Sequence, residues 1–580
     1  MKEVAKLKIS GSRIIVECLV EQGVDTIFGY PGGAILNVYD ELYKNQDRIR
    51  HILTAHEQGA AHAADGYARS TGKVGVVFAT SGPGATNLVT GIATAYMDSS
   101  PIVAITCNVA TSLLGKDSFQ EIDITGVTMP ITKHNFMVRN VEELASVIRE
   151  AFVIAKSGRP GPVLIDIPKE VTDPKKLIDF EPLKNPSEAL GFVTKDSESL
   201  RRALDTPVPG DDEIKAAADI INRASRPVIY AGGGVIISDA ARELLDFANK
   251  ADIPVSQSMM GRSAFPSSSP LNLGMVGMHG TKASNMAVTG SDLVIALGAR
   301  FSDRVISDAS RFAQNSSVFH IDIDPAEINK NIPVSGSLIG NVKDVLSRLL
   351  PLINKADHGE WRKTIGEWKK VQPKMYDENP KDSINPKFMC ECIHRIAGDD
   401  TFITTEVGEH QLWTAQHYPF EKPRTFVTSG GLGTMGFGTG AAIGIQFANP
   451  ERRVVHIAGD GSFRMNCNEL ATISHYGLPL VIVVVNNGTL GNVRLWQRVF
   501  YGERYSATTL DFGPDWVKLA DAYGIQGFRA TNADEFEKVF AEAFKSGRAA
   551  IIDAKVDIDV PVLPMVPGGK AIYEQIMDLN

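Results

Sequence analysis

Three times along this 580-residue chain, short apolar runs alternate with helical segments, and this alternation constrains the fold more than any other feature. The apolar runs have the length of buried strands, roughly four to eight residues. Parallel strands need a crossover between them, usually a helix, so the alternation predicts parallel sheets covered by helices. A chain of this length is too long for one hydrophobic core. We therefore expect an α/β protein with three doubly wound modules.

The three modules are expected at residues 1–170, 213–353 and 387–580, separated by polar stretches at 171–212 and 354–386 that we interpret as linkers. The runs expected as strands in the first module are DTIFGY, VGVVFAT, PIVAITC and GPVLIDI. In the second module they are RPVIYAGGG, IPVSQS, DLVIALGAR and SVFHIDID. In the third module they are TFITTEV, RTFVTS, RRVVHIAGD, LPLVIVVVNN and AAIIDAKV.

Charge, cysteine content and hydropathy exclude several classes of protein. A net charge of -9 argues against a nucleic-acid surface. The five cysteines are sparse and lack the spacing of a metal site, which predicts reduced thiols in a cytoplasmic protein. Apolar runs such as LPLVIVVV are shorter than the ~20 residues of a membrane-spanning helix.

The stretch GDGSFRMNCNELATISHYGLPLVIVVVNNG, residues 459–488, carries the strongest chemical signal. A buried strand ends at the GDG sequence, a helix follows, and the next strand ends at Asn486 and Asn487. A right-handed strand-helix-strand unit brings both strand ends to one edge of the sheet, so Asp460 and Asn487 should be neighbours. A carboxylate, an amide oxygen and a nearby backbone carbonyl are hard ligands for a divalent ion.

Either dipeptide alone is most often just a turn at a strand end. Their combination, with one helix and one strand between them, matches the thiamine diphosphate signature of GDG and NN. In such a site the glycines that flank Asp460 let a diphosphate approach the backbone, and Ser462 can supply a donor.

Thiamine chemistry also needs a carboxyl group that hydrogen-bonds the aminopyrimidine ring, in a place from which water is excluded. Glu57 in HILTAHEQGAAHAADGYAR follows a strand-like run and opens a small-residue helix in the first module. A single glutamate at a helix start is more often a surface residue that favours the helix dipole. Beside the diphosphate signature, we interpret Glu57 as catalytic.

From about residue 10 to 570 the sequence resembles the catalytic subunits of the acetohydroxyacid synthase (acetolactate synthase) family, which are thiamine diphosphate enzymes. The motifs that carry the resemblance include FGYPGGAI, HEQGAAHAADGYAR, TSGPGATN, SFQEIDI, GMVGMHGT, GARFSDRV, TTEVGEHQLW, TSGGLGTMGFG, GDGSFRMN and LWQRVFYGERYS. The resemblance implies a pyrimidine-binding first module, a central module of the FAD-binding type and a diphosphate-binding third module.

The resemblance also implies roles for individual residues. Glu57 would activate the cofactor, and Gly33 and Gln120 would lie near the reacting carbonyl, Gly33 through its backbone N–H. Met435 resembles the bulky residue that bends the cofactor. The Mg²⁺ ligands would be Asp460, Asn487 and the main-chain oxygen of Thr489. The other implied contacts of thiamine diphosphate are Pro31, Gly408, His410, Gln411, Gly433, Gly459, Gly461 and Ser462.

The implied substrate channel contains two cationic residues that would otherwise be interpreted as surface charges. Of these, Arg304 suits the carboxylate of a 2-keto acid, and Trp496 resembles the tryptophan that favours 2-ketobutyrate as acceptor. The full set is Phe119, Lys133, Met278, Arg304 and Trp496. FAD would be structural because carboligation moves no net electrons, and its implied contacts are Arg159, Gly232, Gly233, Gly234, His279, Gly280, Arg300 and Asp322.

The sequence departs from the family pattern at several positions. Ser302 and Asn341 replace aspartates that are usual at the flavin edge, which counts against FAD. Asn492 replaces a usual methionine and Leu495 a usual glutamine near the acceptor site, so the acceptor preference stays open.

The implied reaction decarboxylates pyruvate and adds the hydroxyethyl carbanion to a second 2-keto acid, pyruvate or 2-ketobutyrate. The products, 2-acetolactate or 2-aceto-2-hydroxybutyrate, begin branched-chain amino-acid biosynthesis, including that of isoleucine and valine. Because Glu57 and the diphosphate site lie in different modules, the family pattern implies a homodimer or homotetramer, and a small regulatory subunit is a further implied partner. The alternatives are a pyruvate oxidase that uses thiamine diphosphate and FAD, a 2-keto acid decarboxylase, and a regulatory subunit without activity. Intact Glu57, Asp460 and Asn487 argue against the last of these.

Overall fold

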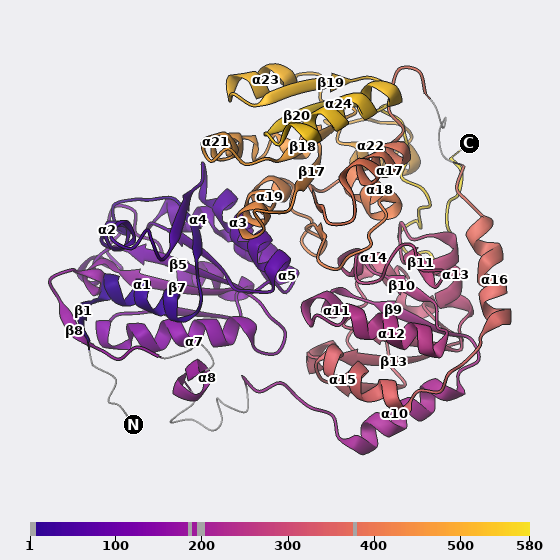
Figure 1. Ribbon diagram of the computed structural model, residues 1–580, viewed down its shortest axis with the longest axis horizontal. Coiled ribbons are helices and arrows are strands. Elements are labelled where there is room, and N and C mark those ends of the chain that lie inside the picture. The colour runs from indigo at the N-terminus through magenta and orange to yellow at the C-terminus, as the bar shows by residue number, and fades with distance from the viewer. Residues whose placement is uncertain (1–6, 184–187, 194–203, 375–379, 580) are drawn as a thin grey trace. The chain divides into compact units, whose positions relative to one another are not determined.

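The computed structural model describes residues 7–183, 188–193, 204–374 and 380–579, and it contains three parallel six-stranded sheets (Figure 1). α-Helices connect most of the successive strands of each sheet, whereas the β10–β11 and β13–β14 connections contain only a short 3₁₀ helix. The three expected α/β modules are therefore confirmed. One additional two-stranded antiparallel sheet joins β1 (Leu7–Ser10) to β8 (Leu177–Phe180).

The first sheet has the strand order β3-β2-β4-β5-β7-β6. Since β3 and β4 lie on opposite sides of β2, the strand order reverses between β2 and β4. In doubly wound sheets, ligands bind at the carboxyl ends of the strands where the order reverses. The strands are β2 (Thr26–Gly29), β3 (Arg50–Leu53), β4 (Gly75–Ala79), β5 (Ile102–Asn108), β6 (His134–Met137) and β7 (Val163–Pro168).

The central sheet has the order β11-β10-β9-β12-β13-β14, so its order reverses between β9 and β12. The strands are β9 (Pro227–Ala231), β10 (Val255–Gln257), β11 (Asn272–Met275), β12 (Leu293–Leu297), β13 (Ser317–Asp322) and β14 (Gly336–Ile339).

The third sheet has the order β16-β15-β17-β18-β20-β19, and its order reverses between β15 and β17. The apolar run of β18 is buried, as expected for a strand covered on both faces. The strands are β15 (Phe402–Thr405), β16 (Phe426–Val427), β17 (Val454–Gly459), β18 (Val481–Asn486), β19 (Gln526–Ala530) and β20 (Ala550–Lys555).

The chain folds into two compact units. Unit 1 comprises Met1–Asp205, Gly431–Glu451 and Met465–Leu478, and unit 2 comprises the remainder. The helices in the described residues of unit 1 are α1 (Gly11–Glu21), α2 (Leu36–Tyr43), α3 (Glu57–Thr71), α4 (Pro83–Asn87), α5 (Val89–Met97), α6 (Ile124–Thr128), α7 (Leu144–Lys156), α8 (Glu188–Val193), α19 (Phe437–Ala448) and α21 (Leu470–His475).

Unit 2 contains the central and third sheets. Its helices are α10 (Asp211–Arg223), α11 (Gly233–Ile237), α12 (Ala241–Ala251), α13 (Lys282–Gly290), α14 (Asp303–Ile306), α15 (Val342–Leu349), α16 (Gly359–Lys370), α17 (Pro386–Ala397), α18 (Glu409–His417), α20 (Asp460–Phe463), α22 (Gly491–Phe500), α23 (Trp516–Ala522) and α24 (Ala533–Ser546).

Within unit 1, α3 and α19 pack closely because both helices are rich in glycine and alanine. A Cβ atom at Gly66 would collide with the backbone of Ala441, and one at Gly444 would collide with the carbonyl of Ala63. The backbones of the two helices are therefore in direct contact. This contact joins the helix that begins at Glu57 to a segment that comes much later in the sequence.

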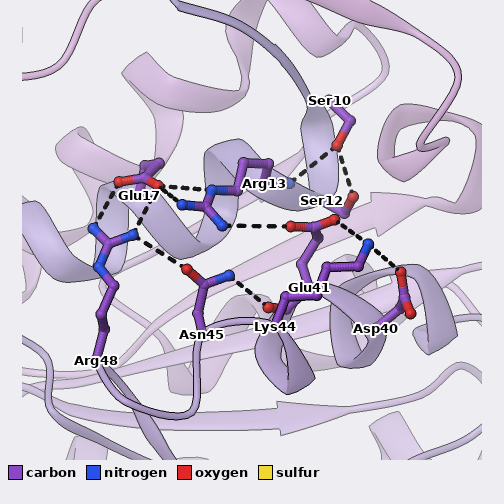
Figure 2. Close-up of polar contacts among 9 residues, drawn as sticks. All are labelled: Ser10, Ser12, Arg13, Glu17, Asp40, Glu41, Lys44, Asn45 and Arg48. Carbon is purple, nitrogen blue, oxygen red and sulfur yellow. Dashed lines mark hydrogen bonds and ion pairs between the residues drawn. The ribbon is translucent and has the colours of Figure 1, made fainter.

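A polar network in the first module connects α1 to α2 and to the turn after α2 (Figure 2). Glu17 accepts hydrogen bonds from Arg13 at 2.7 Å and from Arg48 at 2.8 Å. Glu41 accepts one from Lys44 at 2.8 Å. Partly exposed pairs of this kind each contribute about 1 kcal/mol or less.

Every run that the sequence predicted as a strand contains one, and the strands it missed lie mostly at sheet edges. The missed strands β6, β11, β14 and β19 are edge strands and only partly buried. The stretch expected as the first linker contains β8 and α8, although residues 184–187 and 194–203 lie outside the described part. The second expected linker contains α16, and its residues 375–379 are also not described.

All five cysteines are free thiols, as expected. Within the described ranges, no helix combines the length and the apolar character that crossing a membrane requires.

Candidate active site

The GDG and NN sequences lie at adjacent strand ends of the third sheet. Strands β17 and β18 are parallel neighbours, and Gly459 at the end of β17 is paired with Val485. Asp460 begins α20 and is only 3% exposed. The backbone N–H groups of Gly461 and Gly488 lie beside its carboxylate and favour the charged form. The expected proximity of Asp460 to the end of β18 is therefore confirmed.

A second buried carboxyl group, which the sequence analysis did not select, lies at this edge. Glu409 is the first residue of α18, and its Oε2 accepts a hydrogen bond from Asn487 Nδ2 at 3.1 Å. This bond directs the amide nitrogen of Asn487 toward Glu409. A Cβ atom at Gly491 would collide with the same carboxyl group. The only sequence signal for Glu409 was a glutamate at a helix start inside the TTEVGEHQLW motif.

Both carboxyl groups are held in conditions that disfavour a negative charge. Burial raises the pKa of Asp460 to about 6 and that of Glu409 to about 8, and the charge of Asp460 adds to the shift of Glu409. A divalent cation at this edge would reverse the effect by stabilising the carboxylates. No three His, Cys, Asp or Glu side chains of the described ranges cluster as a metal site, so any site here depends on amide and backbone oxygens as well.

The polar side chains around this edge differ in whether they already form hydrogen bonds within the protein. Ser462 Oγ donates to the Val407 carbonyl at 2.7 Å, and Gln411 Nε2 donates to Thr428 at 2.7 Å. His410 Nε2, in contrast, is buried and has no hydrogen-bond partner among the described residues. Burial lowers the pKa of His410 to about 4, so its imidazole is neutral at physiological pH. A neutral imidazole can donate one N–H to a phosphate oxygen.

Glu57 lies at the carboxyl edge of the first sheet, where β3 leads into α3. It is 8% exposed, and its Oε2 accepts a hydrogen bond from Asn87 Nδ2 at 2.9 Å. A Cβ atom at Gly84 would lie 3.2 Å from Oε1, so the carboxyl group faces the glycine turn after β4. The expected burial of Glu57 is confirmed. Asn87, in the TSGPGATN motif, is a contact that the sequence analysis missed.

The other candidates of unit 1 lie on three irregular segments. Pro31 and Gly33 follow β2, and Gly33 is exposed with open space where a Cβ would be. Gln120 has a left-handed backbone with φ of 60°, and its neighbour Phe119 is 87% exposed. Gly433 and Met435 lie on the segment before α19.

Two cationic candidates of unit 1 have protein partners. The Lys133 ammonium donates to the carbonyl groups of Ile154 and Ser157 at the carboxyl end of α7, where a cation stabilises the helix. The Arg159 guanidinium donates to Ser99 Oγ at 2.8 Å. Lys133 therefore has a clear structural role.

Three predicted substrate residues of unit 2 lie together. The Arg304 guanidinium carbon is 6.0 Å from the centroid of the Trp496 ring. Met278 and Trp496 pack against one small apolar cluster that contains Leu495. Arg304 is 61% exposed in its side chain, so it can reach a ligand.

The predicted flavin contacts of unit 2 follow the strands of the central sheet. Gly232 and Gly234 are needed for protein packing, because a Cβ atom at either would collide with the backbone at Gly298. The other predicted flavin contacts at or just beyond strand ends are Gly233, Arg300 and the buried Asp322. Asn341, one of the departures, accepts a hydrogen bond from Lys343 N–H at 2.9 Å and so begins α15.

The buried His279 stands apart from those strand ends, and its Nδ1 is 3.2 Å from the Pro564 carbonyl oxygen. Gly280 is tightly packed, since a Cβ atom there would collide with Asn285 and with the backbone of Gly277 and Met275.

Three family descriptions match the chain in succession. The thiamine pyrophosphate enzyme N-terminal TPP binding domain matches residues 9–127, the central domain 214–349, and the C-terminal TPP binding domain 406–554.

Curated relatives match nearly the whole chain. A probable acetolactate synthase large subunit of Methanocaldococcus jannaschii is 48% identical, over 97% of this chain and 94% of the relative. The acetolactate synthase large subunit of Haemophilus influenzae is 42% identical, over 98% of both chains. The acetolactate synthase isozyme 3 large subunit of Escherichia coli is 41% identical, over 97% of both.

Proposed function

The chain belongs to the family of acetolactate synthase large subunits, which are thiamine diphosphate enzymes, and on this premise we propose how its residues perform the carboligation. The donor is pyruvate, and the acceptor is a second 2-keto acid, pyruvate or 2-ketobutyrate. The products are 2-acetolactate or 2-aceto-2-hydroxybutyrate. When bound, thiamine diphosphate supplies the carbanion chemistry that no protein side chain provides.

The observation that carries this proposal is the oxygen-rich edge between β17 and β18. Asp460, Asn487 Oδ1 and the Thr489 carbonyl would bind Mg²⁺, which prefers hard oxygen ligands and keeps positions for phosphate oxygens. Gly408, Gly459 and the buried Nε2 of His410, which no described residue binds, would accommodate the diphosphate. Gly461 and Ser462 line the same turn, and Gln411 supports it through Thr428.

Glu57 would hold a proton at the aminopyrimidine end of the cofactor. Its burial and its bond from Asn87 fix one carboxyl oxygen and leave the other for the ligand. Gly33 and Gln120 would orient the reacting carbonyl group, and Met435 would support the bent cofactor. Phe119 would cover the channel.

Arg304 would bind the carboxylate of a 2-keto acid, because guanidinium-carboxylate pairs combine charge with directed hydrogen bonds. Trp496 and Met278 would contact the alkyl end of the acceptor. Their packing against the cluster that contains Leu495 supports a role of these side chains in acceptor preference.

We further propose that the central sheet binds FAD in a structural role, with Arg300 after β12, where the strand order reverses, and Asp322 at the carboxyl end of the neighbouring β13. Partner subunits also belong to the proposal. A homodimer or homotetramer would let Glu57 and the diphosphate site act on one cofactor, and the name "large subunit" borne by the relatives supports a small regulatory partner.

The test incubates the purified chain with pyruvate, thiamine diphosphate and Mg²⁺, with and without FAD, and measures acetolactate. Glu57→Gln should reduce formation at least about 100-fold, since general acid-base groups contribute about 10²- to 10⁴-fold. Glu142→Gln, at an exposed position of the same module, is the matched control and should be neutral. Normal activity of Glu57→Gln would refute the assignment.

The same assay separates the rival activities. Acetaldehyde without acetolactate would identify a decarboxylase. Reduction of bound flavin by pyruvate, followed by its reoxidation with consumption of oxygen, would identify an oxidase.

A further inference from the structure

The last residue of β3 and the turn that leads into α3 have backbone N–H groups that regular secondary structure leaves unpaired. Backbone N–H groups that are shielded from water need hydrogen-bond partners. The N–H of Thr54 lies 3.4 Å from the Gly29 carbonyl oxygen. The N–H groups of Leu53, Ala55 and His56 are instead bound by side chains from residues 469–476, much later in the chain.

Glu469 binds two of these three groups with its two carboxyl oxygens. Oε2 accepts from the Ala55 N–H at 3.1 Å, and Oε1 accepts from the His56 N–H at 3.0 Å. The hydroxyl of Tyr476 accepts from the Leu53 N–H at 2.9 Å. Both side chains therefore hold the residues that come immediately before Glu57.

The position of Glu469 is closely defined. It has no exposed surface, and its Oε2 also accepts from the Thr472 hydroxyl at 2.6 Å. A Cβ atom at Gly59 would collide with its carboxyl group, so only a glycine in α3 allows this approach. Burial raises the pKa of Glu469, whereas the hydrogen bonds from Thr472, Ala55 and His56 oppose that shift.

The first residue of a helix depends on the backbone before it. His56 is the N-cap of α3, and its Nδ1 accepts a hydrogen bond from the Gln58 N–H at 3.0 Å. If α3 shifted its register by one residue along its axis, the Glu57 side chain would turn by about 100° around that axis, because an α-helix has 3.6 residues per turn. Its bond to Asn87 would then be lost.

We propose that Glu469 is a positioning residue for Glu57, and that its carboxylate sets where α3 begins and so where the catalytic carboxyl group points. The proposal rests on the proposed role of Glu57. It adds a function to a glutamate that lies between the GDG and NN sequences and to which the sequence analysis assigned no role.

A purely structural role for Glu469 would only anchor residues 465–478. The two roles differ in what they predict for Glu57. If Glu469 only anchors residues 465–478, its loss lowers the amount of folded protein. If it positions Glu57, its loss lowers the catalytic rate of the folded enzyme, and only in a chain that still has Glu57.

The experiment uses the full-length chain with Glu469→Ala, Glu469→Gln, Glu57→Gln and the double variant Glu57→Gln/Glu469→Ala. Glu469→Gln retains one acceptor oxygen and should be intermediate. The matched control is Glu21→Ala, which removes another buried carboxylate that binds a backbone N–H, that of Leu183 at 2.8 Å, and pairs with Arg149.

Two measurements are made on each variant. Hydrogen exchange of the Ala55 and His56 amides in the cofactor-free protein should be about 10-fold faster or more in Glu469→Ala, as expected when a bond to a charged group is lost. It should not change in Glu21→Ala. The kcat for acetolactate should fall about 10-fold or more with KM for pyruvate little changed, and Glu469→Ala should cause no further loss in the Glu57→Gln background.

Three results would overturn the proposal: unchanged exchange at Ala55 and His56, unchanged kcat, or an equal additional loss in the Glu57→Gln background. If the unaltered chain makes no acetolactate, the proposed function fails. The exchange measurement, which needs neither cofactor nor substrate, would still decide whether Glu469 fixes the start of α3.

Discussion

Replacement of Gly444 by alanine tests the close contact between α3 and α19. Alanine is favoured over glycine in a helix interior by about 1 kcal/mol, so the substitution would stabilise an isolated helix. Here the added Cβ would collide with the Ala63 carbonyl, which is backbone and cannot rotate away. Overpacking costs about 1–3 kcal/mol, and a backbone collision belongs at the upper end. The expected net destabilisation is about 1–2 kcal/mol.

Gly366 provides the matched control, since it lies inside α16 and a Cβ atom added there would have no atom of the described residues within 4 Å. Gly366→Ala should therefore gain up to about 1 kcal/mol. Native-state hydrogen exchange reports each change in its own helix. Amides of α3 and α19 should exchange about 5- to 30-fold faster in Gly444→Ala, whereas amides of α16 should be slower in Gly366→Ala. Slower exchange of α3 and α19 in Gly444→Ala would refute the close packing.

Three further predictions address charge and ligands. Asp166 is 1% exposed and burial raises its pKa to about 6, so the native state holds its proton more tightly than the unfolded state and stability falls as pH rises from about 4 to 6. Between about pH 4 and 6, Asp166→Asn should remove up to about 3 kcal/mol of the change in the free energy of unfolding. Denaturant unfolding at several pH values across that range measures this change, and an unaltered pH profile in the variant would contradict the prediction. Asp460→Ala should abolish the increase in melting temperature caused by Mg²⁺ with thiamine diphosphate, and a retained increase would place the metal elsewhere. Arg304→Lys should raise KM for pyruvate about 10-fold with kcat less affected, and an unchanged KM would remove Arg304 from the substrate site.

The sequence was most informative where a strand is buried on both faces. Runs such as that of β18 are continuous in apolar residues and end in turn-forming ones, so their positions and their parallel order could be predicted. The edge strands β6 and β19 have mixed, partly exposed side chains and resemble loops in the sequence. Their pairing depends on a neighbouring strand and not on their own composition.

Prediction of the site was limited in a similar way. Asp460 and Asn487 lie in one strand-helix-strand unit, so topology alone predicted their proximity. The contacts of Glu57 with Asn87 and of Glu409 with Asn487 connect separate segments, and no local pattern encodes them. The role of Lys133 at the end of α7 also became visible only through its carbonyl partners.

The pairing of α3 with α19 has a consequence for biosynthesis. The ribosome releases α3 long before it has translated α19. Until then, the small-residue face of α3 that packs against α19 stays exposed in the nascent first module. A fragment ending near Asp205 would keep that face exposed and should self-associate or require chaperones. Completion of the amino-terminal unit is thus an event of late translation.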